Sequence, residues 1–337
     1  MLTLLILVIL MSSAFAENAS VIHAFKSADE ALKYINNEHP SQLNIGSVKY
    51  SPSQIQSIKE AMPDNSIFQF STTWCGETIT NDSTEVNFNN GKSKVTVNDL
   101  EAVIYITPSI RKITVSKHRN LSNKEMIPLI EKYPEIDFVW LINFAHEYTC
   151  PSDATAYSTM KPATRGYRLK SSDLEPLKYA KNLKAIDFGH HDITTLDFLK
   201  GLDLELVILG DNMIEDISVL GEMPHLQYAE LFMNRITDIS PLANCEALLD
   251  LNLTGNYVTD LSPLDACNML ERLWSSRNIP MEQETQQHFI RQHPSCEADF
   301  TAYHATADGW RQHPRYKHYI ACFKSLTWTS FNEETEK

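Results

Sequence analysis

Residues 204–212 read Leu-Glu-Leu-Val-Ile-Leu-Gly-Asp-Asn, and this spacing of apolar residues before a terminal Asn returns three more times along the chain. The four asparagines, Asn212, Asn234, Asn256 and Asn278, follow one another at intervals of 22 residues. A coil of 22 residues cannot bury its own apolar face, so coils of this kind must stack and share a core. The sequence therefore predicts a solenoid.

The Leu-x-Leu part of each copy alternates between apolar and other residues, which predicts a strand with one face turned inward. Successive coils rise in one direction, so their strands should form a parallel sheet. Each Asn amide is expected to be buried at a corner, where it must bond backbone groups that the turn leaves open. An upstream copy, Leu183, Ile186 and Phe188, has His191 in the Asn position, and we expect this residue to break the ladder.

The segments that follow three of the asparagines are Asp216-Ile-Ser-Val-Leu, Asp238-Ile-Ser-Pro-Leu and Asp260-Leu-Ser-Pro-Leu. They resemble the 22-residue repeats of the bacterial internalin-like leucine-rich-repeat class. The resemblance implies a curved solenoid with short 3₁₀ return limbs and a concave sheet that binds macromolecules, and it does not imply an enzyme. The three aspartates are expected to cap the return turns, with a ladder of calcium ions as the alternative.

The chain has 337 residues, of which 43% are hydrophobic and 21% charged, and a net charge of −14. These values are typical of a globular protein. The negative charge argues against nucleic acid and against anionic membrane surfaces as partners, since both attract clusters of Lys and Arg. Solubility is the simpler meaning of the charge.

Residues 1–16 form an apolar run that ends in Ala14-Phe15-Ala16, which predicts a signal peptide cut after Ala16. The run is shorter than the roughly 20 residues that span a bilayer. No Lys or Arg precedes it, so an uncleaved N-terminal anchor is the alternative. We expect a secreted or extracellular protein, with association with the cell surface as a further option. An uncleaved N-terminal anchor would be its only contact with a membrane.

Two irregular α/β modules are predicted before the repeats, over residues 17–100 and 101–170. They are related by matches 71 residues apart, such as Ser51 with Ser122 and Thr84 with Thr155. Each has a strand, a helix opened by Ser, a second strand and a polar hairpin. The alternative is an unrelated α+β domain in which these identities arise by chance.

The leucine-rich repeats are assigned to residues 171–280, and residues 281–337 to a final coil and a C-terminal cap. The tail, with Gly309-Trp310-Arg311 followed by His-Pro-Arg-Tyr, resembles that of uncharacterised secreted leucine-rich-repeat proteins of Firmicutes. This likeness names a family without a function. We expect the tail to cover the open end of the solenoid, with Trp310 and Tyr316 in its packing.

No motif for catalysis, a metal or a cofactor is found. The histidines lack the helical spacing of a metalloprotease site, no Cys-x-x-Cys pair is present, and no Gly-rich phosphate loop occurs. Cys245 and Cys267 occupy one interior position in adjacent coils and are expected to be buried thiols, with a disulfide as the alternative. An enzyme using Cys150 or His146 is the last-ranked reading.

The concave face is the candidate binding site. Strand alternation turns the residues two, four and six before each Asn outward. Large side chains gather there, and exposed apolar groups with aromatic and Arg anchors indicate a binding patch. The alternative is that the tail or the N-terminal modules fold over this face. The candidate ligand-binding residues are Leu206, Ile208, Tyr228, Glu230, Phe232, Arg272 and Trp274.

The sequence thus predicts an α/β leucine-rich-repeat solenoid with a concave parallel sheet, preceded by two irregular α/β modules and closed by a short C-terminal cap. The predicted function is non-enzymatic binding of a protein ligand through the concave face. A glycan-binding module and a structural subunit of a surface assembly are the alternatives. Five strands at about 4.8 Å span only about 20 Å, which is marginal for a standard protein interface.

Overall fold

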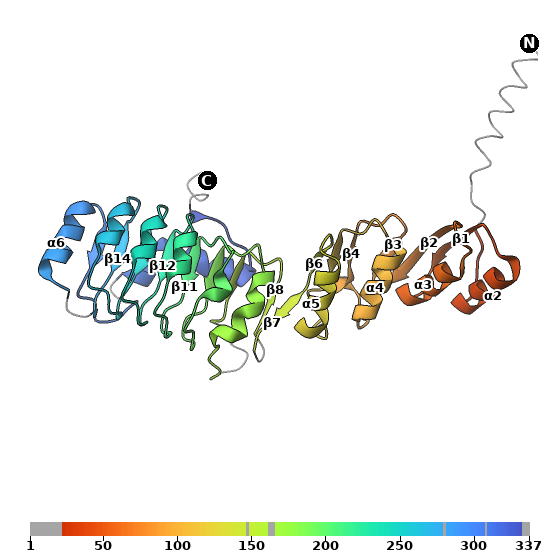
Figure 1. Cartoon of the computed structure of the whole chain (residues 1–337), viewed down its shortest axis with the longest axis horizontal. Coiled ribbons are helices and arrows are strands. Elements are labelled where there is room, and N and C mark those ends of the chain that lie inside the picture. The colour runs from red at the N-terminus through yellow and green to blue at the C-terminus, as the bar shows by residue number, and fades with distance from the viewer. Residues whose placement is uncertain (1–21, 146–147, 161–165, 279–280, 307–308, 332–337) are drawn as a thin grey trace, which may run out of the picture. The chain divides into compact units, whose positions relative to one another are not determined.

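The protein is described from a computed structural model, in which residues 22–145, 148–160, 166–278, 281–306 and 309–331 are placed. The chain divides into two compact units, Met1–Trp140 and Leu141–Lys337 (Figure 1). The predicted signal peptide, residues 1–16, lies outside the described residues. None of the helices in the described ranges is long and apolar enough to cross a membrane.

The first unit alternates helices and strands. Strands β1, β2 and β3 form one sheet, in which β1 and β2 are parallel and β2 and β3 antiparallel; β4, β5 and β6 form a second, parallel sheet. Its elements are α2 (Ala28–Glu38), β1 (Gln42–Val48), α3 (Pro52–Ala61), β2 (Ile67–Trp74), β3 (Glu77–Thr80), β4 (Glu85–Asn87), η1 (Phe88–Asn90), α4 (Val97–Ile106), β5 (Lys112–Thr114), α5 (Asn123–Lys132) and β6 (Asp137–Val139).

The 71-residue period corresponds to a repeated order of elements. Helix, strand, helix and strand occur as α2-β1-α3-β2 and again as α4-β5-α5-β6. The helices α3 and α5 both begin with a capping box, in which Ser51 pairs with Gln54 and Ser122 with Glu125. Both helices thus begin after a Ser residue that forms a capping box.

The second unit contains a seven-stranded parallel sheet in the order β15-β14-β13-β12-β11-β10-β9. The predicted solenoid is therefore present, with one strand more at each end than the five repeats indicated. Its elements are β7 (Leu141–Asn143), β8 (Thr149–Pro151), β9 (Ala156–Ser158), η2 (Ser171–Tyr179), β10 (Ala185–Asp187), η3 (Asp197–Leu199), β11 (Leu206–Ile208), η4 (Ser218–Glu222), β12 (Tyr228–Glu230), η5 (Ser240–Asn244), β13 (Asp250–Asn252), η6 (Ser262–Ala266), β14 (Arg272–Trp274), α6 (Gln283–Gln292), β15 (Glu297–Asp299), η7 (Trp310–Gln312) and α7 (Pro314–Ser325).

The strand β9 lies within residues 101–170, the range predicted for the second N-terminal module. The predicted border at residue 170 is therefore wrong as a border between compact units, which the structure places after Trp140. The reason is a pairing between distant residues: β9 is parallel to β10 and in register with it, from Ala156 opposite Ala185 to Ser158 opposite Asp187. The sequence of β9 lacks the Leu-x-Leu pattern that marks the regular coils.

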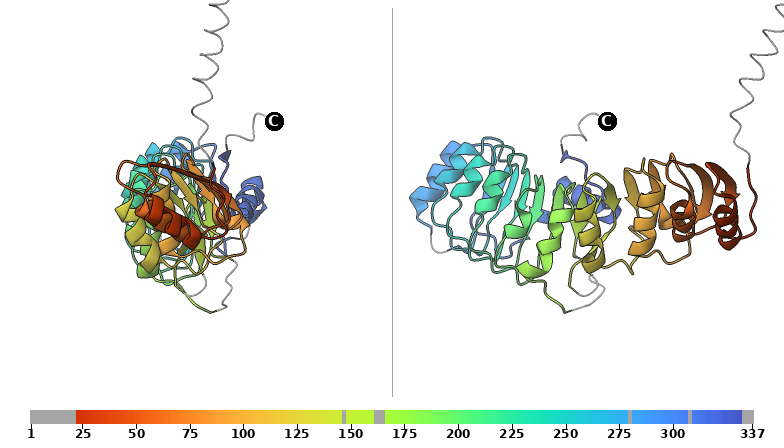
Figure 2. Two further views of the ribbon diagram at one scale, coloured as in Figure 1. Left: turned by 90° about the vertical axis from the view of Figure 1, so that its right-hand side faces the viewer. Right: turned by 45° about the vertical axis from the view of Figure 1, so that its right-hand side comes forward.

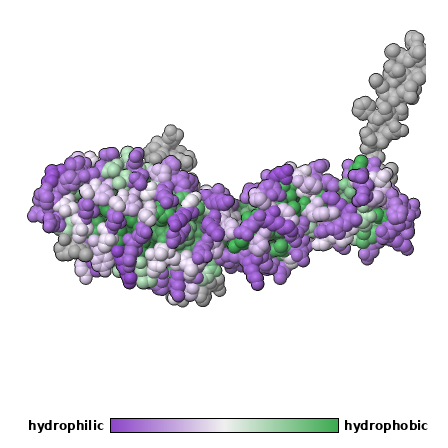
Figure 3. Space-filling view, viewed as in Figure 1, coloured by the Kyte–Doolittle hydropathy of each residue, from purple (hydrophilic) through white to green (hydrophobic). Residues whose placement is uncertain are grey.

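The return limbs are short 3₁₀ helices, as the repeat class implies. An Asp carboxylate precedes each of three limbs and accepts a hydrogen bond of 2.8 Å from the backbone N–H two residues later. The donors are Ser218 to Asp216, Ser240 to Asp238 and Ser262 to Asp260. These bonds confirm the predicted capping role. The last coil has a longer limb, α6, whose outer surface is hydrophilic (Figure 3).

The buried asparagines form the expected ladder. The amide of Asn234 donates to the carbonyls of Leu209 and Leu231, one in the preceding coil and one in its own, at 3.0 and 2.9 Å. Its carbonyl oxygen accepts from the N–H of Ile214 at 3.0 Å. Asn212 and Asn256 repeat this pattern.

His191 does not break the ladder, contrary to the prediction. Its Nδ1 accepts from the backbone N–H of Leu169 at 3.2 Å, which is the role of the Asn carbonyl oxygen in the other coils, and its Nε2 lies 2.8 Å from Thr159 Oγ1. The ring must be neutral to accept at Nδ1. Burial, with a smaller effect of Arg168, lowers the pKa of His191 to about 4.

We predict that replacing His191→Asn changes how stability depends on pH. Between pH about 6.5 and about 4 the unfolded chain protonates this His and the folded chain does not, so the wild type loses stability as the pH falls. The variant lacks this loss, which is at most about 1.4 kcal/mol per pH unit. Urea unfolding of both proteins at pH 7, 6, 5 and 4.5 measures the difference. A constant difference at all four pH values would show that His191 binds its proton equally in the folded and unfolded chains, which would contradict a buried ring that stays neutral.

Candidate functional site: the concave face of the repeat sheet

The outward side chains of the repeat sheet include charged groups that are almost completely buried. Asp187, Glu230, Asp250 and Arg272 are between 0% and 4% exposed. Charged side chains are rarely buried without partners, because desolvation is costly. Something must therefore cover this face and supply opposite charge and hydrogen-bond donors.

The cover is residues 309–331, here called the closing segment. It consists of η7, α7 and the residues that follow, and it lies along the concave face (Figure 2). Pro314 begins α7, where its missing N–H costs nothing, and Leu326 ends it in the left-handed conformation. The buried side of the segment carries Trp310, Tyr319, Cys322, Phe323 and Trp328, which pack on Leu206, Ile208, Tyr228 and Trp274 of the sheet.

The Glu230 carboxylate is the first of two charged anchors. One of its oxygens, Oε1, accepts hydrogen bonds from Trp310 Nε1 at 2.9 Å, from the Tyr319 hydroxyl at 3.1 Å and from the Tyr228 hydroxyl. The guanidinium of Arg311 lies 3.6 Å from the other oxygen. Burial, and then the Glu230 charge, raise the pKa of Tyr228, so its hydroxyl remains a donor.

The Asp250 carboxylate is the second anchor. It accepts from Arg272 Nε at 2.8 Å and from Arg315 Nη1 at 3.0 Å, so one sheet arginine and one segment arginine share it. Arg272 also donates to the carbonyl of Trp310 at 3.1 Å and lies 4.5 Å from the centre of that ring. This geometry combines charge-assisted hydrogen bonds with a cation–π contact.

The far end of the segment is fixed near β9 and β11. Trp328 donates through Nε1 to Glu205 at 2.9 Å and through its backbone N–H to Thr155 Oγ1 at 2.6 Å. The carbonyl of Leu326 accepts from the N–H groups of Thr155 and Ala156 at 3.1 and 3.3 Å. The segment therefore spans the sheet and does not cap its last strand, so the prediction that it covers the open end is wrong.

The seven predicted ligand-binding residues are brought together, but none is exposed. Leu206, Ile208, Tyr228, Glu230, Phe232, Arg272 and Trp274 are all 5% exposed or less. Their expected exposure is wrong, and the alternative that the tail folds over the face describes the structure. Strand alternation gives the side to which a residue points, whereas the cover depends on contacts 38 to 173 residues apart in sequence, such as Arg272 with Trp310 and Trp328 with Thr155.

The candidate ligand-binding residues did not include Asp187 and Asp250, which strand alternation also turns outward, or Arg311, Arg315 and Trp328 of the tail. A signal for them was present. Acids recur at outward strand positions, and the tail has two arginines four residues apart beside aromatic residues, so the charges of the two segments are complementary.

A small hollow of about 40 Å³ remains between the segment and the sheet, lined by residues that include Asp187, Phe232, Arg311 and Tyr319. It is too small for an organic ligand. Asp187 accepts from Ser158 Oγ at 2.9 Å and from the Gly189 N–H at 3.1 Å, and burial raises its pKa to about 6.

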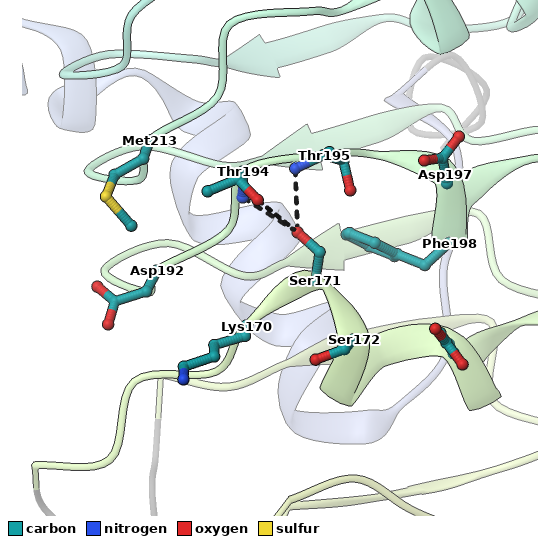
Figure 4. A pocket seen from close by; sticks show the side chains of 10 residues that line it. Lys170, Ser171, Ser172, Asp192, Thr194, Thr195, Asp197, Phe198 and Met213 are labelled. Carbon is teal, nitrogen blue, oxygen red and sulfur yellow. Dashed lines mark hydrogen bonds between the residues drawn. The ribbon is translucent and has the colours of Figure 1, made fainter.

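A larger open hollow of about 600 Å³ lies beside η2 and the next coil (Figure 4). Its polar groups partly satisfy one another: Ser171 Oγ accepts from the backbone N–H groups of Thr194 and Thr195, both at 3.0 Å. These bonds connect two successive coils, so we interpret the polar groups of this hollow as structural contacts between coils.

The rim of the sheet has an unusual backbone. The residue before each Asn, or before His191, is in the left-handed conformation in five successive coils, with φ between 53° and 74°. Only one of these residues is Gly, although other residues are strained there. We call these five residues the corner row: His190, Asp211, Met233, Gly255 and Arg277.

Large side chains are exposed in the corner row, which includes Met233, and at Tyr257 and Tyr303 outside it. Met233, Tyr257 and Tyr303 are 46%, 47% and 76% exposed. Arg277 donates to the carbonyl of Tyr303 at 3.4 Å, and His190 is 2.9 Å from the Asp211 carboxylate. Met, Tyr and Arg are the residue types enriched in protein interfaces.

Of the two residues considered for catalysis, only Cys150 lies within the described residues. Cys150 is buried, and burial raises the pKa of its thiol, which opposes formation of a thiolate. His146 lies outside the described residues. Cys245 and Cys267 are buried free thiols, and burial raises the pKa of Cys267 to about 11. Within the described ranges, no three His, Cys, Asp or Glu side chains form a group that could hold a metal ion.

Comparisons with known proteins agree with the repeat pattern. A family model described as leucine-rich repeats in two copies matches residues 224–266. Curated proteins give no match.

Solved structures that resemble the chain include internalin C2 from Listeria monocytogenes, 18% identical over 64% of this chain and 87% of that one, with a TM-score of 0.37. They also include a leucine-rich-repeat protein from Leptospira interrogans (17% identical, 77% and 72% covered, TM-score 0.40) and a further internalin from Listeria monocytogenes (14%, 94% and 93%, 0.36). The match to the family model confirms the predicted leucine-rich repeats over residues 224–266.

We predict that Trp274→Ala lowers the free energy of unfolding by about 3–5 kcal/mol, because it opens a cavity beneath Trp310. Tyr303→Ala, at a side chain that is 76% exposed, serves as the matched control and should change it by less than about 0.5 kcal/mol. Urea titrations of both variants provide the comparison. Equal effects of the two substitutions would mean that the closing segment does not cover Trp274 in solution.

Proposed function

We propose that this protein is an exported, non-enzymatic binding module. Its second unit, the leucine-rich-repeat solenoid, would bind a protein partner through the rim of the concave sheet. Leucine-rich repeats generally serve as protein-interaction modules, and extended repeat surfaces suit macromolecular ligands. The apolar run of residues 1–16 supports export.

The observation that carries the proposal is the corner row. Five successive coils place their corner residue in the left-handed conformation that favours glycine, yet four of these five residues have a side chain. Backbone strain of this kind persists where surrounding structure imposes it, and it concentrates at functional sites. In this row Met233 and Arg277 are exposed, and Arg277 donates to the carbonyl of Tyr303.

The rim is long enough for a protein contact. Seven strands make six steps of about 4.8 Å, or about 29 Å from β9 to β15. The closed concave face adds the outer side of α7 to the available surface. The five coils of the corner row make four of these steps, about 19 Å, so a partner would also contact α7 to bury the about 800 Å² of a standard interface.

We predict that Met233→Glu reduces partner capture at least about tenfold, because an apolar anchor is replaced by a charge that must be desolvated. Met269→Glu is the matched control, since Met269 is 57% exposed but lies outside the corner row. Residues 17–337 and both variants would be immobilised and exposed to cell-surface and host extracts. Equal capture by the two variants would contradict the rim as the binding surface, and loss of capture after glycosidase treatment of the extract would indicate a glycan ligand.

A further inference from the structure

The concave face and the closing segment meet as two binding partners do. Buried carboxylates on the sheet face arginines and an indole N–H on the segment, and the contacts are made through Arg311, Arg315, Trp310 and Tyr319. Aromatic and Arg anchors in desolvated pockets are typical of binding hot spots. Folded cores, in contrast, rarely place several charges together.

The fit is incomplete, as it is in many interfaces between proteins. Within the described ranges, Glu230 Oε2, Arg311 Nε and Trp274 Nε1 are buried and lack a hydrogen-bond partner. Each orphaned polar atom costs about 1–3 kcal/mol. These costs weaken the hold of the segment on the sheet without affecting the sheet itself.

The repeat coils do not need the segment for their own core. Their leucines and isoleucines, such as Leu209, Leu231 and Leu253, are fully buried. They point to the opposite side of the sheet, toward the return limbs, because successive strand residues alternate. The segment can therefore leave the concave face without exposing this core.

We propose that the closing segment is an exchangeable occupant of the concave face, and that this face binds a helical segment of a partner protein with the same chemistry. That ligand has an aromatic residue next to an Arg in a short turn, followed by a helix with a second Arg in its first turn and an aromatic residue one turn later, as in Trp310, Arg311, Arg315 and Tyr319. The anchors for it are Glu230 and Asp250. The inference deepens the proposed function, because the exposed rim borders this same groove.

The covalent link between the closing segment and the sheet determines how strongly an external ligand must compete for the concave face. A covalently linked occupant competes at an effective concentration in the millimolar range. An external ligand consequently binds the wild-type protein more weakly than it binds the open groove. Its apparent affinity is the intrinsic affinity multiplied by the fraction of molecules in which the groove is open. Weakening the internal occupant should reveal the affinity of the groove.

The test uses a fluorescein-labelled synthetic peptide of residues 309–331, kept reduced, and fluorescence anisotropy with the full-length protein. The variant Arg311→Ala/Arg315→Ala removes both segment charges that face the sheet. It should bind the peptide at least about tenfold more tightly than the wild type. The matched control, Lys317→Ala/Lys324→Ala, removes two charges from the exposed side of the same helix and should bind like the wild type.

A second substitution identifies the site. Adding Asp250→Asn to the Arg311→Ala/Arg315→Ala variant should reduce peptide binding at least about tenfold, because the peptide's own arginine then lacks its carboxylate. A peptide in which the residue equivalent to Arg315 is Ala should show the same loss. Together these measurements form a double-mutant cycle.

Two results would overturn the inference. One is a folded Arg311→Ala/Arg315→Ala variant, with a cooperative melting transition, that binds the peptide no better than the lysine control. The other is a variant that does not fold, since the segment would then be part of the core. Neither result bears on the rim, whose role is decided separately by partner capture with Met233→Glu.

Discussion

A buried side-chain amide closes each regular coil of the second unit, and the solenoid depends on it. The amide of Asn234 joins the carbonyls of two coils while its oxygen accepts from a third backbone group. Inside the corner water is excluded, so a buried side chain must satisfy these backbone groups. The spacing of the asparagines consequently fixes the spacing of the strands and the register of the sheet.

His191 shows how far this constraint can be met by another residue. Its Nδ1 performs the accepting half of the asparagine role, at the cost of remaining neutral in the folded state. The chemistry required at the corner is thus a buried acceptor aimed at the preceding coil. Asn also supplies donors to carbonyls, which explains why the central coils use it.

The two faces of the sheet obey different physics. The face toward the return limbs is packed with aliphatic side chains, and the hydrophobic effect is sufficient to stabilise it. The concave face holds Glu230 and Asp250, whose burial is offset by Trp310, Arg311, Arg315 and Tyr319 of the closing segment together with Tyr228 and Arg272 of the sheet. Buried ion pairs contribute little net stability but demand a specific partner. That demand makes this face selective, and the strained rim beside it remains open to solvent.

The resemblance of the repeats implied the 3₁₀ return limbs. The sequence by itself determined the solenoid, its period, the Asp residues that precede the return turns, and the side to which each strand residue points. These features follow from local periodicity and from polar groups that must be satisfied within one or two coils. It also grouped Tyr228, Glu230 and Trp274 correctly on one surface. Only the tertiary structure decided that β9 belongs to the repeat sheet and that residues 309–331 cover the concave face. Both depend on contacts between distant segments, and their energies come from complementary shape and charge that no periodic pattern records.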